Sequence, residues 1–551
     1  MRCFIKINLS IVLALIFLWV LCINAHAQKV RDGRVLIEVS SMSDAYFMLP
    51  VGSEGLLLFG MSDQVKEGQQ MFEFSKFDTG FNKEWHVKTP LNRRMEYQLQ
   101  YYDEAHKKLY ILLSQRRGFV LSGDYAIIKI NIKTGNTQTL EGAFETYALI
   151  KDFKALNGVA YLGGHFYPSR RELFLRQALT LAGLYIPAIF GSLHYDLAPL
   201  LIFADFNKNK ITHFDAENEG NARITGLSIA HQKNKTYALL SDKPDRHTAH
   251  FKVLGFDAAN QKVSAFELKA KEIDLTSGRV IHTDKNEKII IGTYTSRPKR
   301  HRESSYTFDS SLSSPSTGLY YAKVANGQQK FLQTYPFHAF DNFYKFLSDK
   351  PHIRFRTESS RSVARRGVGI QYNLLVHDLI VKDNNYIMIA EVYYPEYEQR
   401  CYYRYNPYRG YTERTCYDVF VGFRFTHAVV AAFDQQGKLE WDDSFSMWDI
   451  LTTNLTTQIK YFLEEDEILF LYGHGSEIRT RVLKDKSFID EGSSLEIDLS
   501  AGHGEDSRTI SSGIEYWYDN YFIAYGLHRL RSETSGRQGR RVFSFLKIRY
   551  E

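Results

Sequence analysis

The sequence predicts an all-β chain assembled from a repeated unit, and three observations support this. A polar turn followed by a short apolar strand recurs along the chain at nearly constant spacing. A second element, a strand, a turn and another strand, follows most copies. Aromatic residues, which favour strands, make up 14% of the chain. Together these features indicate a β-repeat fold large enough for an extensive core.

The first observation is the polar turn and apolar strand, which occurs eight times. The strands read LLLFG, LYILLS, VAYLGG, TYALLS, KIIIGTY, YIMIAEVYY, ILFLYG and YFIAYG. They are apolar at nearly every residue, which is typical of strands buried on both faces. The residues that precede them are hairpin formers.

The first observation includes the spacing between these strands. The reference positions are Leu56, Leu109, Val159, Thr236, Ile289, Tyr386, Ile468 and Tyr521. The gaps between them are 53, 50, 77, 53, 97, 82 and 53 residues, and each of the three long gaps contains an insertion. A period of about 50 residues is that of one four-stranded propeller blade.

The second observation is the strand-turn-strand element that follows. Two copies, at 77–85 and 433–441, share the pattern F-D-x5-E-W. We expect Asp78 and Asp434 to cap the turns rather than to act in catalysis, and the Trp to pack between blades. The repeat resembles that of PQQ-like and related β-propellers. If the protein is an enzyme, this resemblance implies a quinoprotein-type dehydrogenase. Such enzymes often use a pair of adjacent cysteines, and this sequence contains no such pair.

We therefore predict a β-propeller of eight four-stranded blades, forming one domain over 28–551, with loop and short helical insertions. A lone strand, RVLIEVS, precedes the first repeat, and the sequence ends on the strand RVFSFLKIRYE. We expect Val35–Ser40 to pair with this last strand and close the ring, because closure removes exposed sheet edges. The alternatives are a β-sandwich pair and an open array.

The first 27 residues have the features of a secretory signal peptide. Arg2 and Lys6 precede an apolar run over 11–22, and Ala25-His26-Ala27 provides a small-x-small cleavage site. The run is shorter than the roughly 20 residues of a membrane span. We predict cleavage after Ala27 and a periplasmic, outer-membrane-associated or extracellular protein. The alternatives are an uncleaved anchor and lipidation at Cys22.

Charge and cysteine content narrow the possible partners. Loss of Arg2 and Lys6 lowers the formal net charge from +6 to +4, which is too mild to indicate a nucleic-acid binder. Cleavage leaves only Cys401 and Cys416 of the four cysteines. Two cysteines in one short polar insert of an exported protein are expected to pair as a disulfide. We find no obvious metal ligands near them.

The insert at 396–417 contains these cysteines and alternating Tyr and Arg residues, which are typical of binding hot spots. A disulfide would hold such a hairpin rigid and reduce the entropy lost on binding. The alternative is a stiff hairpin with no partner. The candidate contact surface comprises Tyr402, Tyr403, Tyr405, Tyr408, Arg409 and Tyr411.

Three further insertions distinguish the chain. The insert at 167–195 is apolar and is predicted to form short helices broken by Pro187. We prefer the interpretation that these helices fold back over the propeller as a cap. The alternative is peripheral membrane contact through 171–193. The inserts at 296–317 and 338–373 are basic. If both lie on the same face of the propeller, they would form an anion-binding rim. The alternative is that they are ordinary solvated loops. The candidate rim comprises Arg297, Lys299, Arg300, Arg354, Arg356, Arg365 and Arg366.

No catalytic motif stands out. The sequence contains no G-x-S-x-G elbow, H-E-x-x-H pair, P-loop or C-x-x-C motif. We expect Asp442 and Asp443 to be solvated, and we expect no cofactor. The sequence favours a non-catalytic binding or scaffold module at the bacterial cell envelope, with another envelope protein or a glycan as partner. The alternative is a propeller enzyme, a lyase or glycosidase, that acts on a polysaccharide.

Overall fold

The computed structural model describes most of the chain, with its longest gaps at 1–27, 167–197, 297–314 and 346–371. The described residues are 28–30, 35–39, 46–66, 69–91, 95–117, 120–166, 198–214, 222–242, 250–283, 287–296, 315–345, 372–406, 411–453, 455–464, 466–474, 477–489, 493–496, 506–531 and 540–550. Helix in these residues is confined to the short 3-10 turns η1 (Gly52–Glu54), η3 (His231–Lys233) and η5 (Phe337–Ala339). In the described part, no helix has the length and apolar character needed to cross a membrane.

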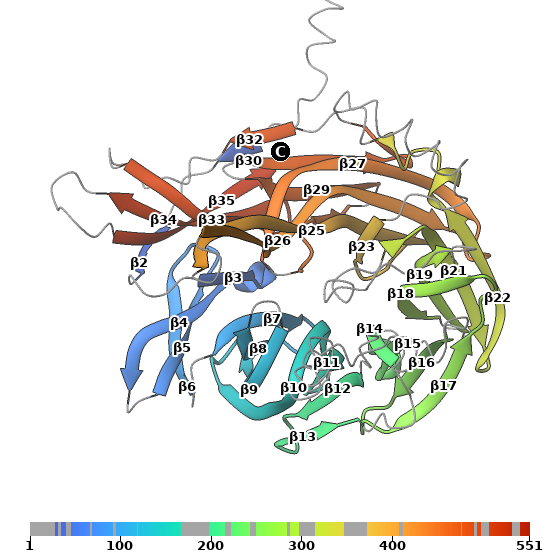
Figure 1. Ribbon diagram of the computed structural model, residues 1–551, viewed down its shortest axis with the longest axis horizontal. Helices are drawn as coiled ribbons and strands as arrows, with labels where there is room; N and C mark the ends of the chain where they lie inside the picture. Colours follow the sequence, from blue (N-terminus) through green and yellow to red (C-terminus); the bar gives the residue numbers. More distant parts are fainter. Residues whose placement is uncertain are drawn as a thin grey trace, which may run out of the picture.

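The sheets are arranged round a ring in chain order, so that the first sheet, in blue, lies beside the last, in red (Figure 1). Within the described residues, antiparallel pairing connects the strands into seven sheets. The first sheet has the order β3-β4-β5-β6, with β3 (Tyr46–Pro50), β4 (Leu56–Lys66), β5 (Gln69–Phe77) and β6 (Lys83–Leu91).

The second sheet has seven strands, because one long strand belongs to two four-strand units. Its order runs from β13 to β7, with β7 (Glu96–Asp103), β8 (Lys108–Arg117), β9 (Val120–Asn131), β10 (Thr137–Leu156), β11 (Val159–Phe166), β12 (Ala198–Asp205) and β13 (Lys210–His213). The N-terminal half of β10 pairs with β9, and its C-terminal half pairs with β11. The sheet therefore contains two successive units that share β10.

Two four-stranded sheets follow. The third contains β14 (Ala222–Ala230), β15 (Lys235–Asp242), β16 (His250–Phe256) and β17 (Lys262–Leu268). The fourth contains β18 (Ile273–His282), β19 (Glu287–Ser296), β21 (Gly318–Ala325) and β22 (Gln328–Pro336).

The last three sheets complete the ring. The fifth contains β20 (Pro315–Ser316), β23 (Tyr372–Val376), β24 (Ile380–Lys382), β25 (Asn385–Asn406), β26 (Tyr411–Phe433) and β27 (Leu439–Thr452). The sixth contains β28 (Lys460–Leu463), β29 (Glu467–His474), β30 (Glu477–Lys484), β31 (Ser487–Phe488) and β32 (Ser493–Glu496). The seventh contains β33 (Asp506–Tyr518), β34 (Tyr521–Arg531), β35 (Arg540–Tyr550), β1 (Gln28–Val30) and β2 (Val35–Val39).

All eight strands predicted from the apolar runs are present, as β4, β8, β11, β15, β19, β25, β29 and β34. Each lies between two neighbours in its sheet, which explains why it is apolar on both faces. The described residues form eight buried apolar clusters between successive four-strand units. The eightfold blade count stays a prediction, because the hydrogen-bonded sheets of the described residues number seven.

The pairing of the N-terminal strand is as predicted. Val35 lies opposite Phe545, and Val39 lies opposite Arg541, so β2 adds to the edge of β35. β1 also pairs with β35, at its other end. Apolar side chains from the first and last sheets, including Leu56 and Phe543, form one cluster. The ends of the repeat array are therefore packed against each other rather than left as open edges.

The repeated turns have the predicted capping. Asp78 accepts hydrogen bonds from the backbone N–H groups of Gly80 and Asn82, at 2.9 and 2.8 Å. Asp434 accepts equivalent bonds from Gln436 and Lys438, both at 2.8 Å. These Asx turns are local, which is why sequence reasoning could find them.

One expectation about this element is wrong. Asp442 and Asp443 are buried rather than solvated. Asp442 accepts hydrogen bonds from the backbone N–H groups of Asp341 and Asn342, and Asp443 accepts one from Phe488. Both carboxylates satisfy backbone donors of segments distant in sequence, which offsets part of the cost of burying them.

Candidate functional site: a projecting hairpin and a central ion-pair network

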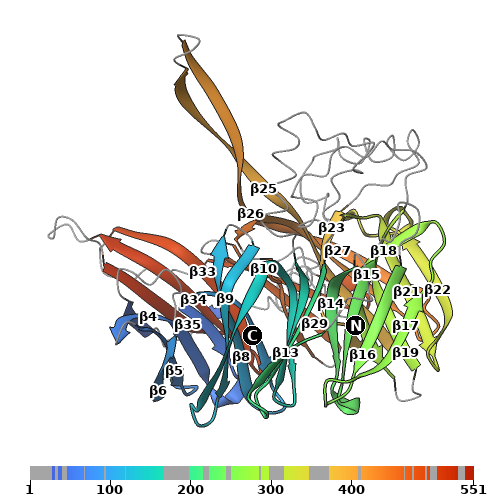
Figure 2. The ribbon, with the colours of Figure 1, turned by 60° about the horizontal axis from the view of Figure 1, so that its bottom comes forward.

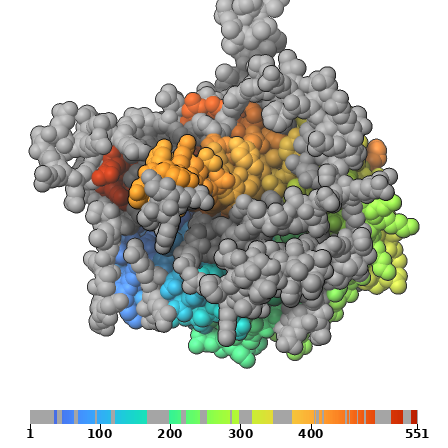
Figure 3. Space-filling model, viewed as in Figure 1, coloured from blue at the N-terminus to red at the C-terminus, as the bar shows by residue number. Residues whose placement is uncertain are grey.

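The most prominent feature outside the ring is a hairpin formed by the distal halves of β25 and β26 (Figure 2). β25 pairs with β23 as far as Tyr393, and β26 pairs with β27 as far as Phe423. Past these residues the described strands pair only with each other, from Glu396 to Asn406 on β25. The space-filling view shows this hairpin as orange surface on the face seen in Figure 1 (Figure 3).

The base of the hairpin is fixed in the core. Tyr393 and Phe423 are buried, with ring centroids 5.7 Å apart in an edge-to-face arrangement. Phe420 continues this aromatic row, with centroids 5.0 Å from Phe423 and 5.7 Å from Tyr397. Register shifts at Val392/Tyr393 and Glu396/Tyr397 bend the ladder where it leaves the sheet. A rigid base therefore supports the projecting part.

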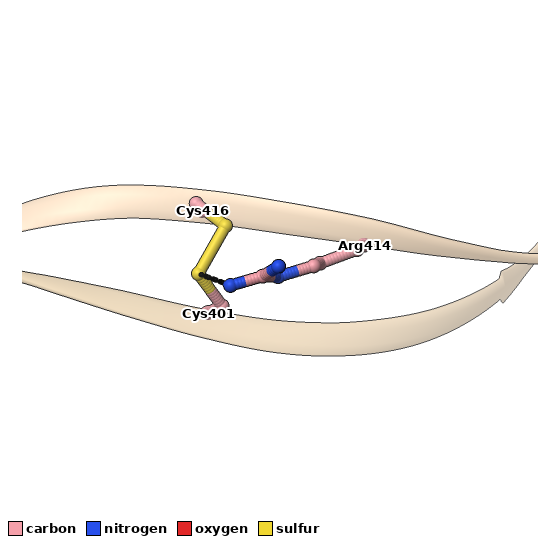
Figure 4. The surroundings of a disulfide bond; sticks show 3 residues. All are labelled: Cys401, Arg414 and Cys416. Atoms are coloured by element: carbon pink, nitrogen blue, oxygen red, sulfur yellow. Dashed lines mark hydrogen bonds between the residues drawn. A yellow bond between two sulfur atoms is a disulfide. The ribbon is translucent and has the colours of Figure 1, made fainter.

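Cys401 and Cys416 lie directly opposite each other in this hairpin and form a disulfide. The guanidinium of Arg414 points along the hairpin toward them, and its Nη2 donates to Cys401 Sγ at 3.2 Å (Figure 4). An isolated two-stranded ribbon is marginally stable in water. A covalent link across the two strands compensates for the missing neighbouring strands.

The described tyrosines of the predicted contact surface are exposed, but strand alternation divides them between two faces. Tyr403, the most exposed at 72%, lies with Tyr405 on the face of the disulfide. Tyr402 and Tyr411 lie on the opposite face. The predicted contact surface is therefore two aromatic faces of one ribbon rather than a single patch.

Several predicted site residues lie outside the described residues. Tyr408 and Arg409, at the tip of the hairpin, are among them. The insert at 167–195, which is predicted to form short helices, also lies outside them. So does the whole candidate basic rim, which comprises Arg297, Lys299, Arg300, Arg354, Arg356, Arg365 and Arg366. The basic rim and the cap remain predictions.

The described start of the insert at 338–373 has a structural role. Phe340 and Phe343 are buried in the cluster between the fourth and fifth sheets, and their ring centroids are 6.0 Å apart. Phe343 also lies 4.4 Å from Phe337, with the rings stacked. The aromatic run that opens this insert therefore belongs to the core.

A second site, which sequence reasoning missed, is an ion-pair network between sheets. Arg279 on β18 donates through Nη1 to Asp152 on β10 at 2.8 Å, and its Nε lies 3.3 Å from Asp378, between β23 and β24. Lys154 also pairs with Asp378. Arg279 further donates to the carbonyl of Val376, so one side chain connects three sheets. No local motif marks these residues, because they meet only through the ring.

The electrostatics of the network favour its charged form. Burial alone would raise the pKa of Asp378, but Lys154 and Arg279 outweigh it and lower the pKa to about 2. Burial alone would lower the pKa of Arg279, but Asp152 and Asp378 raise it. The opposite charges therefore stabilise each other across the ring.

The described residues contain no group of three or more His, Cys, Asp or Glu side chains placed to hold a metal ion. The repeated four-strand units, their packing in chain order and the pairing of the first strand with the last define a β-propeller. The candidate binding features of the described chain are a projecting hairpin and a network of charged groups that joins three sheets.

The similarity of this chain to known proteins is structural and distant. No protein-family model matches the chain, and a search of curated proteins finds no significant match. The chain is similar to the β-propeller domain of the Trilobed protease from Pyrococcus furiosus, with 9% identity, a TM-score of 0.33, and coverage of 82% of this chain and 95% of that one. It is also similar to the tricorn protease, with 10% identity, a TM-score of 0.35, and coverage of 85% and 36%. An uncharacterized protein from Listeria monocytogenes matches with 10% identity, a TM-score of 0.33, and coverage of 85% and 97%.

Proposed function

We propose that this protein is an exported, non-catalytic binding module of the bacterial cell envelope, and that the β25–β26 hairpin is its contact surface. The observation that carries the proposal is the disulfide-closed ribbon with exposed tyrosines on both faces. Its free part, from Tyr397 to Asn406 on β25, extends for roughly 30 Å at the usual rise of a strand.

The composition of the ribbon supports binding rather than packing. Tyr403 and Tyr405 are large, partly apolar and exposed, although they contribute nothing to the described cores. Tyrosine gives large contact area with few rotatable bonds, so its burial by a partner loses little entropy. The disulfide and the buried base hold the ribbon in one shape before binding, which reduces the entropy cost further.

The presence of tyrosines on both faces favours insertion over simple side-on contact. A partner that covered only the face of Tyr403 would leave Tyr402 and Tyr411 in water. A groove or a pair of surfaces that encloses the ribbon would bury both faces. The partner class that fits is therefore another envelope protein with a concave surface.

Site-specific crosslinking in cells tests this proposal. A photoreactive amino acid at Tyr403 or Tyr402 is expected to capture the same partner, whereas the same substitution at the exposed Val381 of β24 is expected to capture none. The variant Tyr403→Ser plus Tyr405→Ser should lower recovery of that partner by roughly tenfold or more. The control variant Val381→Ser should leave recovery unchanged.

Two results would contradict the proposal. One is recovery of the same partners by the Tyr403→Ser plus Tyr405→Ser variant as by the natural protein. The other is glycan turnover by the purified protein without any hairpin-dependent partner, which would favour the lyase or glycosidase alternative. Export is tested separately by N-terminal sequencing of protein from cells, where Gln28 is the expected first residue.

A further inference from the structure

The disulfide of the projecting hairpin lies at the surface of the molecule. Cys401 is half-buried and Cys416 is exposed, in the part of the ribbon where the described strands pair only with each other. Structural cysteines are typically buried and inert, whereas reactive ones lie in partly exposed, electropositive surroundings. The position of this disulfide therefore leaves Cys416 open to a thiolate from another molecule.

The two sulfur atoms differ in their electrostatic surroundings. Nη2 of Arg414 donates to Cys401 Sγ at 3.2 Å, and the guanidinium lies beside that sulfur (Figure 4). A neighbouring cation stabilises the thiolate that forms when an S–S bond breaks. Exposed Asp418 lies on the same face as Cys416, two residues further along β26, and its negative charge disfavours a thiolate there. Cys401 is therefore the better leaving group of the pair.

Strand register places Arg414 beside the disulfide. Cys401 lies opposite Cys416, and Tyr403 lies opposite Arg414 one step closer to the tip. Side chains two residues apart on a strand share a face, so the guanidinium and both sulfur atoms are on one side of the ribbon. A shift of one residue would turn Arg414 to the other side. The ladder itself therefore fixes the cation at this sulfur.

We propose that the Cys401–Cys416 disulfide is a site of thiol–disulfide exchange, at which a dithiol reductant attacks Cys416 and Cys401 leaves as a thiolate beside Arg414. The first thiolate of the reductant forms a bond to Cys416 Sγ, and the S–S bond breaks with its electron pair on Cys401 Sγ. The second thiolate of the reductant attacks the sulfur that joined Cys416 and releases Cys416, which takes a proton from water. Two electrons have then passed to the disulfide, and the reductant is left as a disulfide.

A dithiol is the class of reductant that fits, because its second step is intramolecular and therefore fast. The ribbon stands clear of the ring, so a dithiol on another protein can reach it as readily as a small molecule can (Figure 2). Reduction removes the covalent link between two strands that lack other neighbours, and so loosens the ribbon. The effect of this on partner binding rests on the proposed function, whereas the exchange reaction does not.

Thiol trapping on the full natural protein tests which sulfur is attacked. The protein is incubated with 2-mercaptoethanol, the reaction is stopped early with iodoacetamide, and tryptic peptides are analysed by mass spectrometry. We expect the mercaptoethanol adduct on Cys416 and the carbamidomethyl group on Cys401. The reverse assignment, or equal amounts of the two products, would overturn the proposal.

Reduction rates test the role of Arg414. Dithiothreitol is expected to reduce Arg414→Gln roughly three- to tenfold more slowly than the natural protein, because the leaving thiolate loses its cation. Arg414→Lys keeps the charge and should react within about threefold of the natural protein. Arg400→Gln changes an exposed arginine on the opposite face of the ribbon, and as the matched control it should react as the natural protein does.

Two further outcomes would overturn the proposal. One is that dithiothreitol leaves the disulfide of the natural protein intact while circular dichroism shows the ring to be folded. The other is that Arg414→Gln is reduced as fast as Arg400→Gln. The trapping experiment uses the natural protein alone, so a variant that fails to fold does not affect it. None of these results changes the crosslinking expected at Tyr403, so the exchange site and the proposed contact surface fail separately.

Discussion

The indole Nε1 of Trp517 donates a 2.8 Å hydrogen bond to the carbonyl oxygen of Gly55, and this bond joins the last sheet of the ring to the first. Trp517 is buried, and Phe81 stacks on it with ring centroids 5.6 Å apart. Gly55 has φ of 112°, and a Cβ there would lie 1.9 Å from the carbonyl oxygen of Phe77. The bond therefore depends on a backbone conformation that only glycine provides without strain.

Trp517→Phe is expected to lower the free energy of unfolding by about 1–3 kcal/mol, because a buried carbonyl loses its donor. Urea denaturation measures this change. Trp85→Phe is the matched control, since Trp85 Nε1 has no hydrogen-bond partner in the described residues. Equal losses in the two variants would show that ring size, and not the bond to Gly55, causes the effect.

Arg279→Met is expected to destabilise the protein by about 3–5 kcal/mol, because it leaves the buried carboxylate of Asp152 without its cation. The double variant Arg279→Met plus Asp152→Asn should recover part of that loss. The exposed pair of Arg400 and Glu398 is the control, and Arg400→Met should cost at most about 1 kcal/mol. Additive effects of Arg279→Met and Asp152→Asn would contradict the coupling.

His427 gives the protein a predictable sensitivity to acid. It is buried against the rings of Phe343 and Tyr372, and burial lowers its pKa to about 3 from an ordinary value of 6.5. A depressed pKa means that its contribution to stability is complete above pH 6.5 and declines as the pH falls below it. At pH 5 the loss from this group is about 2 kcal/mol.

Unfolding free energies measured between pH 7 and pH 5 check this expectation. His427→Leu should reduce the dependence of the unfolding free energy on pH by an amount equivalent to up to about one bound proton. Buried His165 keeps part of the slope in the His427 variant, because burial holds its pKa below the usual value too. An unchanged slope in His427→Leu would contradict the assignment.

Replacing both Cys401 and Cys416 by Ser is expected to loosen the hairpin without unfolding the ring. The link closes a 15-residue separation and stabilises the closed ribbon by about 3 kcal/mol. Hydrogen exchange should therefore quicken at 397–406 and 411–420, while the melting temperature changes little. The amides of β29 serve as the internal control, and faster exchange there would show that the disulfide supports the ring itself.

Much of the fold follows from local sequence features. An apolar strand after a polar turn is a short-range pattern, so all eight central strands were predictable. The capping by Asp78 and Asp434, and the pairing of Cys401 with Cys416, also depend on neighbours in one turn or hairpin. The pairing of Val35 with Phe545 was predictable because a closed ring needs an edge strand.

Only the tertiary structure decided where distant side chains meet. Asp152 and Arg279 are 127 residues apart and carry no motif, so only the closed ring shows that they pair. Asp442 and Asp443 look like surface residues after a Trp, yet they bind the backbone of other segments.

The hairpin shows the same division within a single element. The sequence predicts that Tyr402 and Tyr403 belong to an insert rich in Tyr and Arg, and that a disulfide closes this insert. Strand register then placed them on opposite faces, and the bulges at its base set its direction away from the ring. Composition is a local property, whereas register and direction depend on packing against neighbouring sheets, which is why only the folded chain decides them.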